Sequence, residues 1–300
     1  MSPESPYLTT EEAAAYLRMG ARRLYDLAAS GHAPGAKVAG KWVFPRPALD
    51  RGVEAGMTAP ADVAPAPPIV AGSHDPLLEW ALRRADSGLA LLCEGSSAGL
   101  DRLQRGEAGV AAIHLHANDG DDDDANIDAL KSRSRLVDVV LIAFARREQG
   151  LIAAPGDPLG LTRAPDPLGA AAAAKARFGL RQSGAGAQRL LDRLLARGAR
   201  ALADLAASEA TYATGADLAA AIRAGDADCG IVSRSVAAAL GLPFASLAWE
   251  RFDLAMRRRV YFEPGPQRLF ALMRAPACAE QAARLRGYDV SEAGRVRLNR

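Results

Sequence analysis

A run of small residues, Arg181-Gln182-Ser183-Gly184-Ala185-Gly186-Ala187, leads directly into a helical pattern that begins at Gln188. Small residues let the backbone approach a bound group closely, and the helix behind them offers unpaired N–H groups and the positive end of its dipole. The junction can therefore hold an anion. An ordinary loop before a helix has a similar composition, so the assignment needs support from other parts of the chain.

Three further segments have the same character. Gly95-Ser96-Ser97 precedes a helical pattern near Leu100, Thr214-Gly215 precedes one over 216–224, and Gly72-Ser73 precedes one that starts near Pro76. Hydroxyl groups at such positions cap the helix or donate to a ligand. The sequence therefore predicts one anion site built from several helix N-termini.

Length and composition describe a globular protein of two or three domains. The chain has 300 residues, of which 49% are hydrophobic, and a net charge of +2. Cys93, Cys229 and Cys278 lack metal-ligand spacing and are predicted to be buried thiols of a reducing compartment. Neither a signal-peptide pattern nor a long apolar run is present, so we expect a soluble cytoplasmic protein without membrane contact.

Residues 7–51 are predicted to form a helix-turn-helix with a wing. Thr9 and Glu12 form a capping box at the first helix, and a second helix over 21–30 ends at Gly31. Residues 37–44 then form a hairpin with Ala39-Gly40 at its tip. This order is typical of DNA-binding modules whose second helix enters the major groove.

The charge distribution of this segment agrees with a DNA-binding module. Between residues 18 and 46, six basic side chains stand against one acidic residue, Asp26. The patterns Leu8-Thr9-Thr10-Glu11-Glu12-Ala13-Ala14 and Gly40-Lys41-Trp42 resemble the excisionase-like helix-turn-helix domains, relatives of the winged MerR type. The resemblance implies binding of double-stranded operator DNA by a homodimer on paired half-sites. The predicted DNA-binding residues are Arg18, Arg22, Arg23, Tyr25, Lys37, Lys41 and Trp42.

The rest of the chain is predicted to be α/β. Residues 52–68 are a proline- and alanine-rich linker between the domains 1–51 and 69–300. From Ile69 onward, strand-like runs alternate with helical ones, which favours largely parallel sheets. The predicted strands are 69–71, 89–93, 110–113, 137–144, 228–232 and 244–247. Ligands of such sheets bind at the carboxyl ends of the strands.

Several stretches of this second domain, among them 96–103, 181–186, 225–231 and 287–290, resemble the periplasmic-binding-protein-like domains of bacterial regulators, and within them the molybdate and tungstate binders. The resemblance implies a type II fold of two lobes joined by a two-strand hinge. Lobe I would span 69–145 and 246–300, and lobe II 146–245, with an oxyanion in the cleft between them. The residues implied to bind the ligand are Ser73, Ser96, Ser97, Arg181, Gln182, Ser183, Gly184, Ala185, Thr214, Gly215 and Ser233.

The chemistry of the ligand sets the expected donors. A fully ionised tetrahedral oxyanion only accepts hydrogen bonds, so we expect neutral donors such as hydroxyls and backbone N–H groups. Molybdate or tungstate is the expected effector, and no other cofactor is expected. A larger organic molecule is the alternative ligand.

Metal binding and catalysis have weaker support. His114 and His116 share one face of a strand end, but no third ligand follows nearby, so we predict no metal site. The acidic run 119–124 lacks the ligand spacing of a calcium loop and is predicted to be solvated. No nucleophile elbow, Walker loop or zinc signature is present, so we predict no catalytic residues and no enzyme.

These observations predict a one-component transcriptional regulator that binds operator DNA and senses an oxyanion. Molybdate or tungstate is the expected oxyanion. Two alternatives stay open. The chain could be a cytoplasmic binding protein whose N-terminal module docks a partner protein. It could also be an enzyme of molybdenum cofactor assembly that uses the cleft as its active site.

Overall fold

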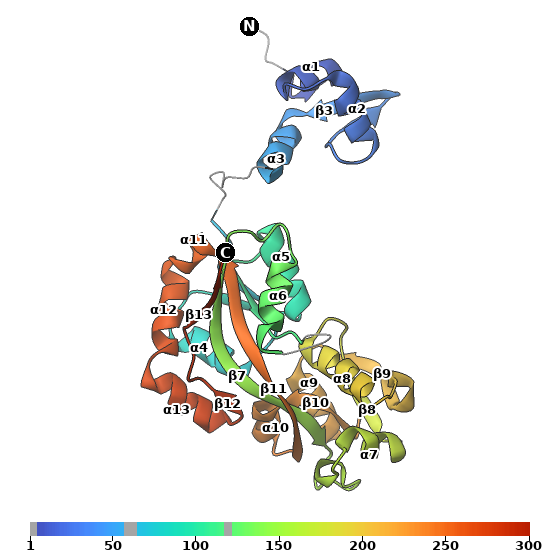
Figure 1. The fold of residues 1–300 in the computed structure, drawn as a ribbon, viewed down its shortest axis with the longest axis vertical. Helices are drawn as coiled ribbons and strands as arrows, with labels where there is room; N and C mark the ends of the chain where they lie inside the picture. The colour runs from blue at the N-terminus through green and yellow to red at the C-terminus, as the bar shows by residue number, and fades with distance from the viewer. Residues whose placement is uncertain (1–4, 57–64, 117–121) are drawn as a thin grey trace. The chain divides into compact units, whose positions relative to one another are not determined.

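The computed structural model describes residues 5–56, 65–116 and 122–300. The chain divides into two compact units, Met1–Pro65 and Ala66–Arg300, which are described separately here (Figure 1). None of the helices in the described ranges has the length and hydropathy of a membrane span.

The first unit is a small helical domain with a three-stranded antiparallel sheet in the order β1-β3-β2. Its elements are β1 (Tyr7–Leu8), α1 (Thr10–Tyr16), α2 (Ala21–Ala29), β2 (Ala36–Val38), β3 (Lys41–Pro45) and α3 (Arg46–Gly56). Leu24 of α2, Phe44 of β3 and Leu49 of α3 are fully buried together. The predicted helix-turn-helix with a wing is confirmed.

Local sequence signals account for this unit. The Thr9 hydroxyl accepts from the Glu12 N–H at 3.2 Å, and the Glu12 carboxylate accepts from the Thr9 N–H at 2.8 Å, so the predicted capping box is present. Ala39 and Gly40 have φ values of 48° and 82°, as a tight two-residue hairpin turn requires.

Helix α3 differs from the prediction. It continues to Gly56, so residues 52–56, expected to belong to the linker, are helical. Leu49 anchors the helix in the core, and the Tyr16 hydroxyl donates to the Asp50 carboxylate at 2.7 Å. These tertiary contacts outweigh the weak apolar pattern of the segment. The linker residues 57–64 lie outside the described ranges.

The second unit is built on one ten-stranded mixed sheet. Its path is β5-β4-β6-β11-β7-β10-β8-β9, and β12 and β13 both pair with β7. The strands are β4 (Ile69–Gly72), β5 (Ala90–Cys93), β6 (Val110–Ile113), β7 (Val139–Ala153), β8 (Arg177–Arg181), β9 (Ala206–Tyr212), β10 (Cys229–Ser233), β11 (Phe244–Arg257), β12 (Tyr288–Asp289) and β13 (Val296–Asn299).

The helices of this unit follow the strands in the chain. The α-helices are α4 (Pro76–Arg84), α5 (Ser96–Arg105), α6 (Ala125–Lys131), α7 (Pro167–Ala173), α8 (Gly186–Arg197), α9 (Gly215–Ala224), α10 (Arg234–Leu240), α11 (Arg258–Tyr261), α12 (Pro264–Met273) and α13 (Pro276–Leu285). Short 3₁₀ turns occupy Asp122–Asp124, Leu161–Arg163 and Leu202–Asp204.

Two long strands, β7 and β11, join the lobes. They pair antiparallel along almost their whole length, from Phe244 opposite Ile152 to Arg257 opposite Val139. β6 attaches to one end of β11, and β10 attaches to the opposite end of the pair through β7. Figure 1 shows both strands running from one lobe into the other. The predicted two-lobed fold with a two-strand hinge is confirmed.

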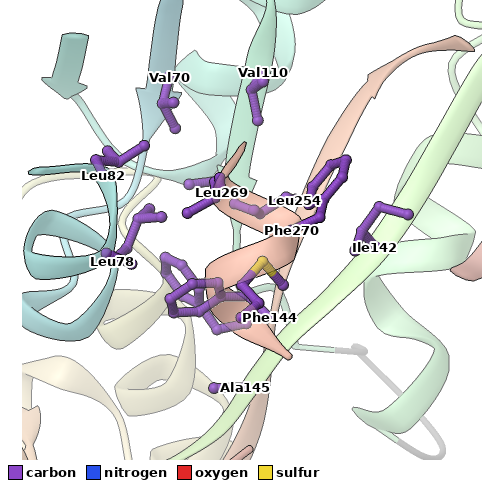
Figure 2. Packing of buried hydrophobic residues seen from close by; sticks show 14 of the residues in the cluster. Val70, Leu78, Leu82, Val110, Ile142, Phe144, Ala145, Leu254, Leu269 and Phe270 are labelled. Atoms are coloured by element: carbon purple, nitrogen blue, oxygen red, sulfur yellow. The ribbon is translucent and has the colours of Figure 1, made fainter. Parts of the chain in front are cut away.

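Apolar side chains cover both faces of the sheet in each lobe. In lobe I, residues of α4 and α12 pack on one face around Phe144, Leu254 and Phe270 (Figure 2), and Leu100 and Leu130 cover the other face. Lobe II has two corresponding clusters, around Phe178 and around Leu218. These cores fix the strand ends that face the cleft.

Candidate anion-binding cleft

A cavity of about 30 Å³ lies between the lobes, at the strand ends. Lobe I and the hinge strand β7 contribute Ser73, His74, Pro76, Cys93, Gly95, His114, Arg147 and Gln149. Lobe II contributes Ala185, Ala187, Ala213, Gly215, Val232, Ser233, Val236 and Arg181. The position agrees with the rule that ligands of α/β sheets bind beyond the carboxyl ends of strands.

The lobes touch around this cavity. The Gln182 side-chain amide donates to the Glu94 carbonyl at 3.1 Å, and the Ser235 and Tyr288 hydroxyls lie 3.0 Å apart. Arg234 of lobe II also pairs with Glu148 of the hinge strand β7. The structure therefore represents a closed cleft.

Several helix N-termini surround the cavity: the sequence predicts those of α5 and α8 as anion sites, but not that of α10. The N-cap residues of α5, α8 and α10 are Gly95, Ala185 and Ser233, and none of these three makes a side-chain cap hydrogen bond. Their first N–H groups are therefore available to an anion. Helices α4 and α9 differ, because the Asp75 carboxylate accepts from the first turn of α4 and the Thr214 hydroxyl accepts from the Asp217 N–H of α9.

The structure brings five of the predicted ligand residues to the cavity: Ser73, Ala185, Gly215, Ser233 and Arg181. The other six lie nearby in supporting positions. Ser96 is fully buried, and its hydroxyl lies 2.8 Å from that of Ser73 and accepts from the His114 N–H at 3.0 Å. Ser96 therefore fixes Ser73 instead of reaching the cavity.

The remaining five predicted residues do not line the cavity. The Thr214 hydroxyl donates to Asp217 at 2.7 Å within the capping box of α9, so it is already engaged. Gln182 bridges the lobes, and Ser97 lies opposite Gly184. Ser183 is exposed.

Arg181 is the main positive group of lobe II in the cavity. Its Nε and Nη2 donate to the carbonyls of Tyr212 and Ala213 at 3.0 and 2.8 Å. No carboxylate in the described part of the chain lies within ion-pair distance of Arg181. Burial and the charge of Arg147 lower its pKa to about 10, so it stays protonated at neutral pH.

Arg147 is the second guanidinium group at the cavity, and it is only 3% exposed. Its Nε donates to Glu250 at 2.5 Å and its Nη1 to Asp75 at 3.0 Å. Its guanidinium also stacks on Phe252 at 4.4 Å. Burial opposes the charge, but the two carboxylates hold the pKa of Arg147 above its ordinary value.

His114 and Gln149 contribute buried polar atoms to the cavity that the two guanidinium groups line. Burial and Arg147 lower the pKa of His114 to about 4, so its imidazole is neutral at pH 7. The Gln149 amide donates to Glu250 at 2.8 Å, whereas its Oε1 is buried and has no partner among the described residues. The cavity is therefore lined by two guanidinium groups, those of Arg147 and Arg181, as well as by neutral polar groups.

Five polar or reactive residues that line the cavity are absent from the predicted ligand set: His74, Cys93, His114, Arg147 and Gln149. A usable signal was present for two of them. Arg147 and Gln149 interrupt the apolar run of β7, whose other residues are almost all buried. A polar side chain buried in a strand needs partners. Arg147 forms ion pairs with Asp75 and Glu250, and both Arg147 and Gln149 line the cavity.

The structure also supplies a third group beside the two predicted strand-end histidines. Glu250 of β11 lies 3.0 Å from Nδ1 of His114 and 3.0 Å from Nε2 of His116. Glu250 is separated from them by more than a hundred residues, so no local spacing in the sequence indicated it.

The predicted DNA-binding residues lie on the surface of the first unit, with one exception. Arg18, Arg22, Arg23 and Tyr25 are exposed, as are Lys37 and Lys41 of the hairpin. Trp42 is half-buried, lies edge-on to Tyr25 at 6.4 Å and has a buried Nε1. Its ring therefore connects the second helix to the hairpin.

Comparisons with known proteins agree with both units. A model described as a PBP superfamily domain matches residues 79–274, and one described as a helix-turn-helix domain matches residues 7–56. No curated protein matches the sequence.

Two solved structures illustrate the fold of the second unit. A tungstate ABC transporter protein of Geobacter sulfurreducens superposes with a TM-score of 0.53 at 12% identity, over 72% of this chain and 97% of that chain. A phosphate ABC transporter substrate-binding protein of Clostridium perfringens, with bound phosphate, superposes with a TM-score of 0.52 at 10% identity, over 72% and 96%. At this identity the likeness concerns the fold alone.

Proposed function

The chain belongs to the PBP superfamily, and from this premise we propose that it is a transcriptional regulator whose cleft binds a small tetrahedral oxyanion as its effector. Molybdate and tungstate are the leading candidates. The helix-turn-helix domain binds operator DNA in the cytoplasm, and the protein acts as a homodimer on paired half-sites. The cleft binds its ligand without turning it over.

The observation that carries this proposal is the unpaired charge of Arg181. A partly buried guanidinium group without a carboxylate is costly, and a bound anion would supply the missing partner. Uncapped helix N-termini and the hydroxyls of Ser73 and Ser233 add donors around the same space. A cavity of about 30 Å³ suits a small ion better than a larger organic molecule.

One cavity atom favours a second candidate. Gln149 Oε1 is a buried acceptor, and it can only be satisfied by a ligand or a water that carries a proton. Hydrogenphosphate has such a proton, whereas molybdate and tungstate do not. The fold does not distinguish phosphate from molybdate or tungstate as the ligand, because it occurs in proteins described as tungstate and phosphate transport components.

The proposed regulation rests on differential binding. An anion held by residues of both lobes stabilises the closed cleft, and it acts on DNA only if the closed and open forms differ in operator affinity. A dimer converts such a difference into a changed spacing of two DNA-binding domains. The coupling between anion binding and operator binding is tested by measuring the operator affinity with and without the anion.

Isothermal titration of the full chain with molybdate, tungstate, sulfate and phosphate tests the ligand assignment. Binding of molybdate or tungstate alone supports the leading proposal, and binding of phosphate alone supports the second candidate. If none of the four binds, the oxyanion assignment fails, while the DNA-binding assignment is untouched.

A further inference from the structure

Three side chains with metal-binding atoms converge beside the cleft. His114 and His116 follow β6, and Glu250 lies on β11. One ligand atom from each residue lies within 4.8 Å of the other two, and all three side chains are buried. A single ion can therefore contact all three residues with small side-chain movements.

One of these ligand atoms, Nδ1 of His114, makes no hydrogen bond with a described residue. This atom is buried and lies 3.0 Å from Glu250 Oε1, yet the two atoms form no hydrogen bond. A buried polar atom without a partner is uncommon in native structures and requires an explanation such as an ion or a water.

The local charge also favours a cation. Arg147 is the one buried cation within reach of the two buried carboxylates Glu250 and Asp75, in the part of the chain that the structure describes. These three groups together carry one net negative charge, since Arg181, the other guanidinium group of the cavity, donates to the carbonyls of Tyr212 and Ala213 instead of to these carboxylates, and uncompensated buried charge is unfavourable. A divalent ion at the histidines would offset it.

The cluster is reachable from two sides. His114 lines the cleft cavity, and His116 lines a separate surface groove with Ser97, Arg133 and Arg189. The groove offers an entry path, and the cavity offers room for a water as a fourth ligand.

We propose that His114, His116 and Glu250 form a binding site for one divalent transition-metal ion of the zinc type. Two imidazole nitrogens and one carboxylate oxygen suit Zn²⁺ and its late first-row neighbours, and they do not suit Mg²⁺ or Ca²⁺, which prefer oxygen ligands. Arg147 and Gln149 hold Oε1 of Glu250, so Oε2, which lies 3.0 Å from Nε2 of His116, is the oxygen that would bind the metal, and the metal would replace this hydrogen bond. The metal site adjoins the anion cavity through His114, so the two ligands are tested separately.

The test is a titration of chelator-treated full-length protein with Zn²⁺ in oxyanion-free buffer, followed by calorimetry and by competition with a coloured chelator. One ion binds per chain, and Mg²⁺ does not compete. His114→Gln and His116→Gln each weaken binding by about 100-fold or more, since even changes outside the ligand set cost about 10–100-fold.

Two matched variants serve as controls. His74→Gln removes another histidine of the same cavity, one that contacts Glu79 instead of Glu250, and Cys93→Ser removes the cavity thiol. Both retain the wild-type zinc affinity. Circular dichroism of the metal-free variants verifies folding. If a variant does not fold, the Co²⁺ spectrum of the wild type decides, because the proposed ligands give no thiolate charge-transfer band.

Three results would overturn the proposal. They are no stoichiometric zinc binding by the wild type, unchanged zinc affinity in both folded histidine variants, or loss of zinc binding in Cys93→Ser. Because no oxyanion is present, none of them bears on the anion assignment.

Discussion

Gly186, at the start of α8 in lobe II, lies directly against His114 of lobe I. A Cβ atom on Gly186 would lie 2.2 Å from Cε1 of His114 and 2.4 Å from its carbonyl oxygen, closer than any carbon can approach. Part of the small-residue run 181–187 therefore serves the contact between the lobes, in addition to the approach of an anion. The closed cleft depends on the absence of a side chain at this point.

Gly186→Ala is expected to hold the lobes apart and weaken anion binding. Overpacking of this kind costs about 1–3 kcal/mol, and about 1.4 kcal/mol corresponds to a tenfold change in affinity. Calorimetric titration with the anion that the wild type binds measures the effect. Gly20→Ala, at an open position of the first unit with no atom within 4 Å, is the control and leaves the anion affinity unchanged. Wild-type affinity in Gly186→Ala would show that the ligand does not need this closed form.

Arg181→Gln removes the unpaired cation of the cavity. We expect the anion affinity to fall about 10–100-fold, because a hydrogen bond to a charged group contributes about 1.5–3 kcal/mol. Arg177→Gln is the matched control, since Arg177 lies on the same strand, is exposed and pairs with Asp228 at 2.7 Å. Calorimetry of both variants distinguishes the loss of a contact in the cavity from the effect of removing one positive charge from lobe II. Equal losses in the two variants would contradict the role given to Arg181.

Local signals explain why the first unit was predictable. The capping box at Thr9, the left-handed turn at Ala39-Gly40 and the helix end at Gly31 depend on neighbours within a few residues. The hinge strands were harder to predict. The predicted strands 137–144 and 244–247 cover only part of β7 and β11, because Arg147, Gln149 and Glu250 break their apolar pattern.

The same polar residues explain the missed part of the site. They are buried in the hinge because they neutralise one another across chain distances that no spacing rule covers, as Arg147 does with Asp75 and Glu250. Strands β8, β9, β12 and β13 were also missed. β9 is mostly exposed and lies at the edge of the sheet, so it has little apolar pattern.

Cys93 offers a reporter of ligand binding. It lines the cavity and is partly exposed, and burial together with Glu79 raises the pKa of its thiol, so alkylation is expected to be slow and to accelerate as the pH rises. A bound anion should slow this alkylation further by filling the cavity. Mass spectrometry after iodoacetamide treatment measures the rate.

Cys229 is the internal control for that experiment. Burial and the nearby Asp228 and Asp157 raise the pKa of its thiol to about 12, so it stays protonated and unreactive at about pH 8.5. Rapid labelling of Cys229 would report unfolding. Identical Cys93 rates with and without a ligand that calorimetry shows to be bound would place that ligand elsewhere.

The exposed arginines of α2 should act through the DNA backbone or the base edges. Arg22→Ala and Arg23→Ala are each expected to weaken operator binding, and a lost phosphate contact lowers the slope of log affinity against log salt by about 1. Fluorescence anisotropy with a duplex selected by the wild type from a random pool provides the measurement. Arg51→Ala, an exposed arginine of α3 outside the helix-turn-helix and hairpin, is the control. Unchanged slopes in both α2 variants would contradict the predicted orientation.

The central claim is that an oxyanion in the cleft controls DNA binding. The most direct measurement is the operator affinity of the full chain, at constant ionic strength, with and without a saturating concentration of the anion that calorimetry identifies. We predict a change of about 5-fold or more, the usual size of allosteric coupling, in the wild type and no change in Arg181→Gln. An operator affinity that stays the same in the wild type while the anion is bound would contradict the account.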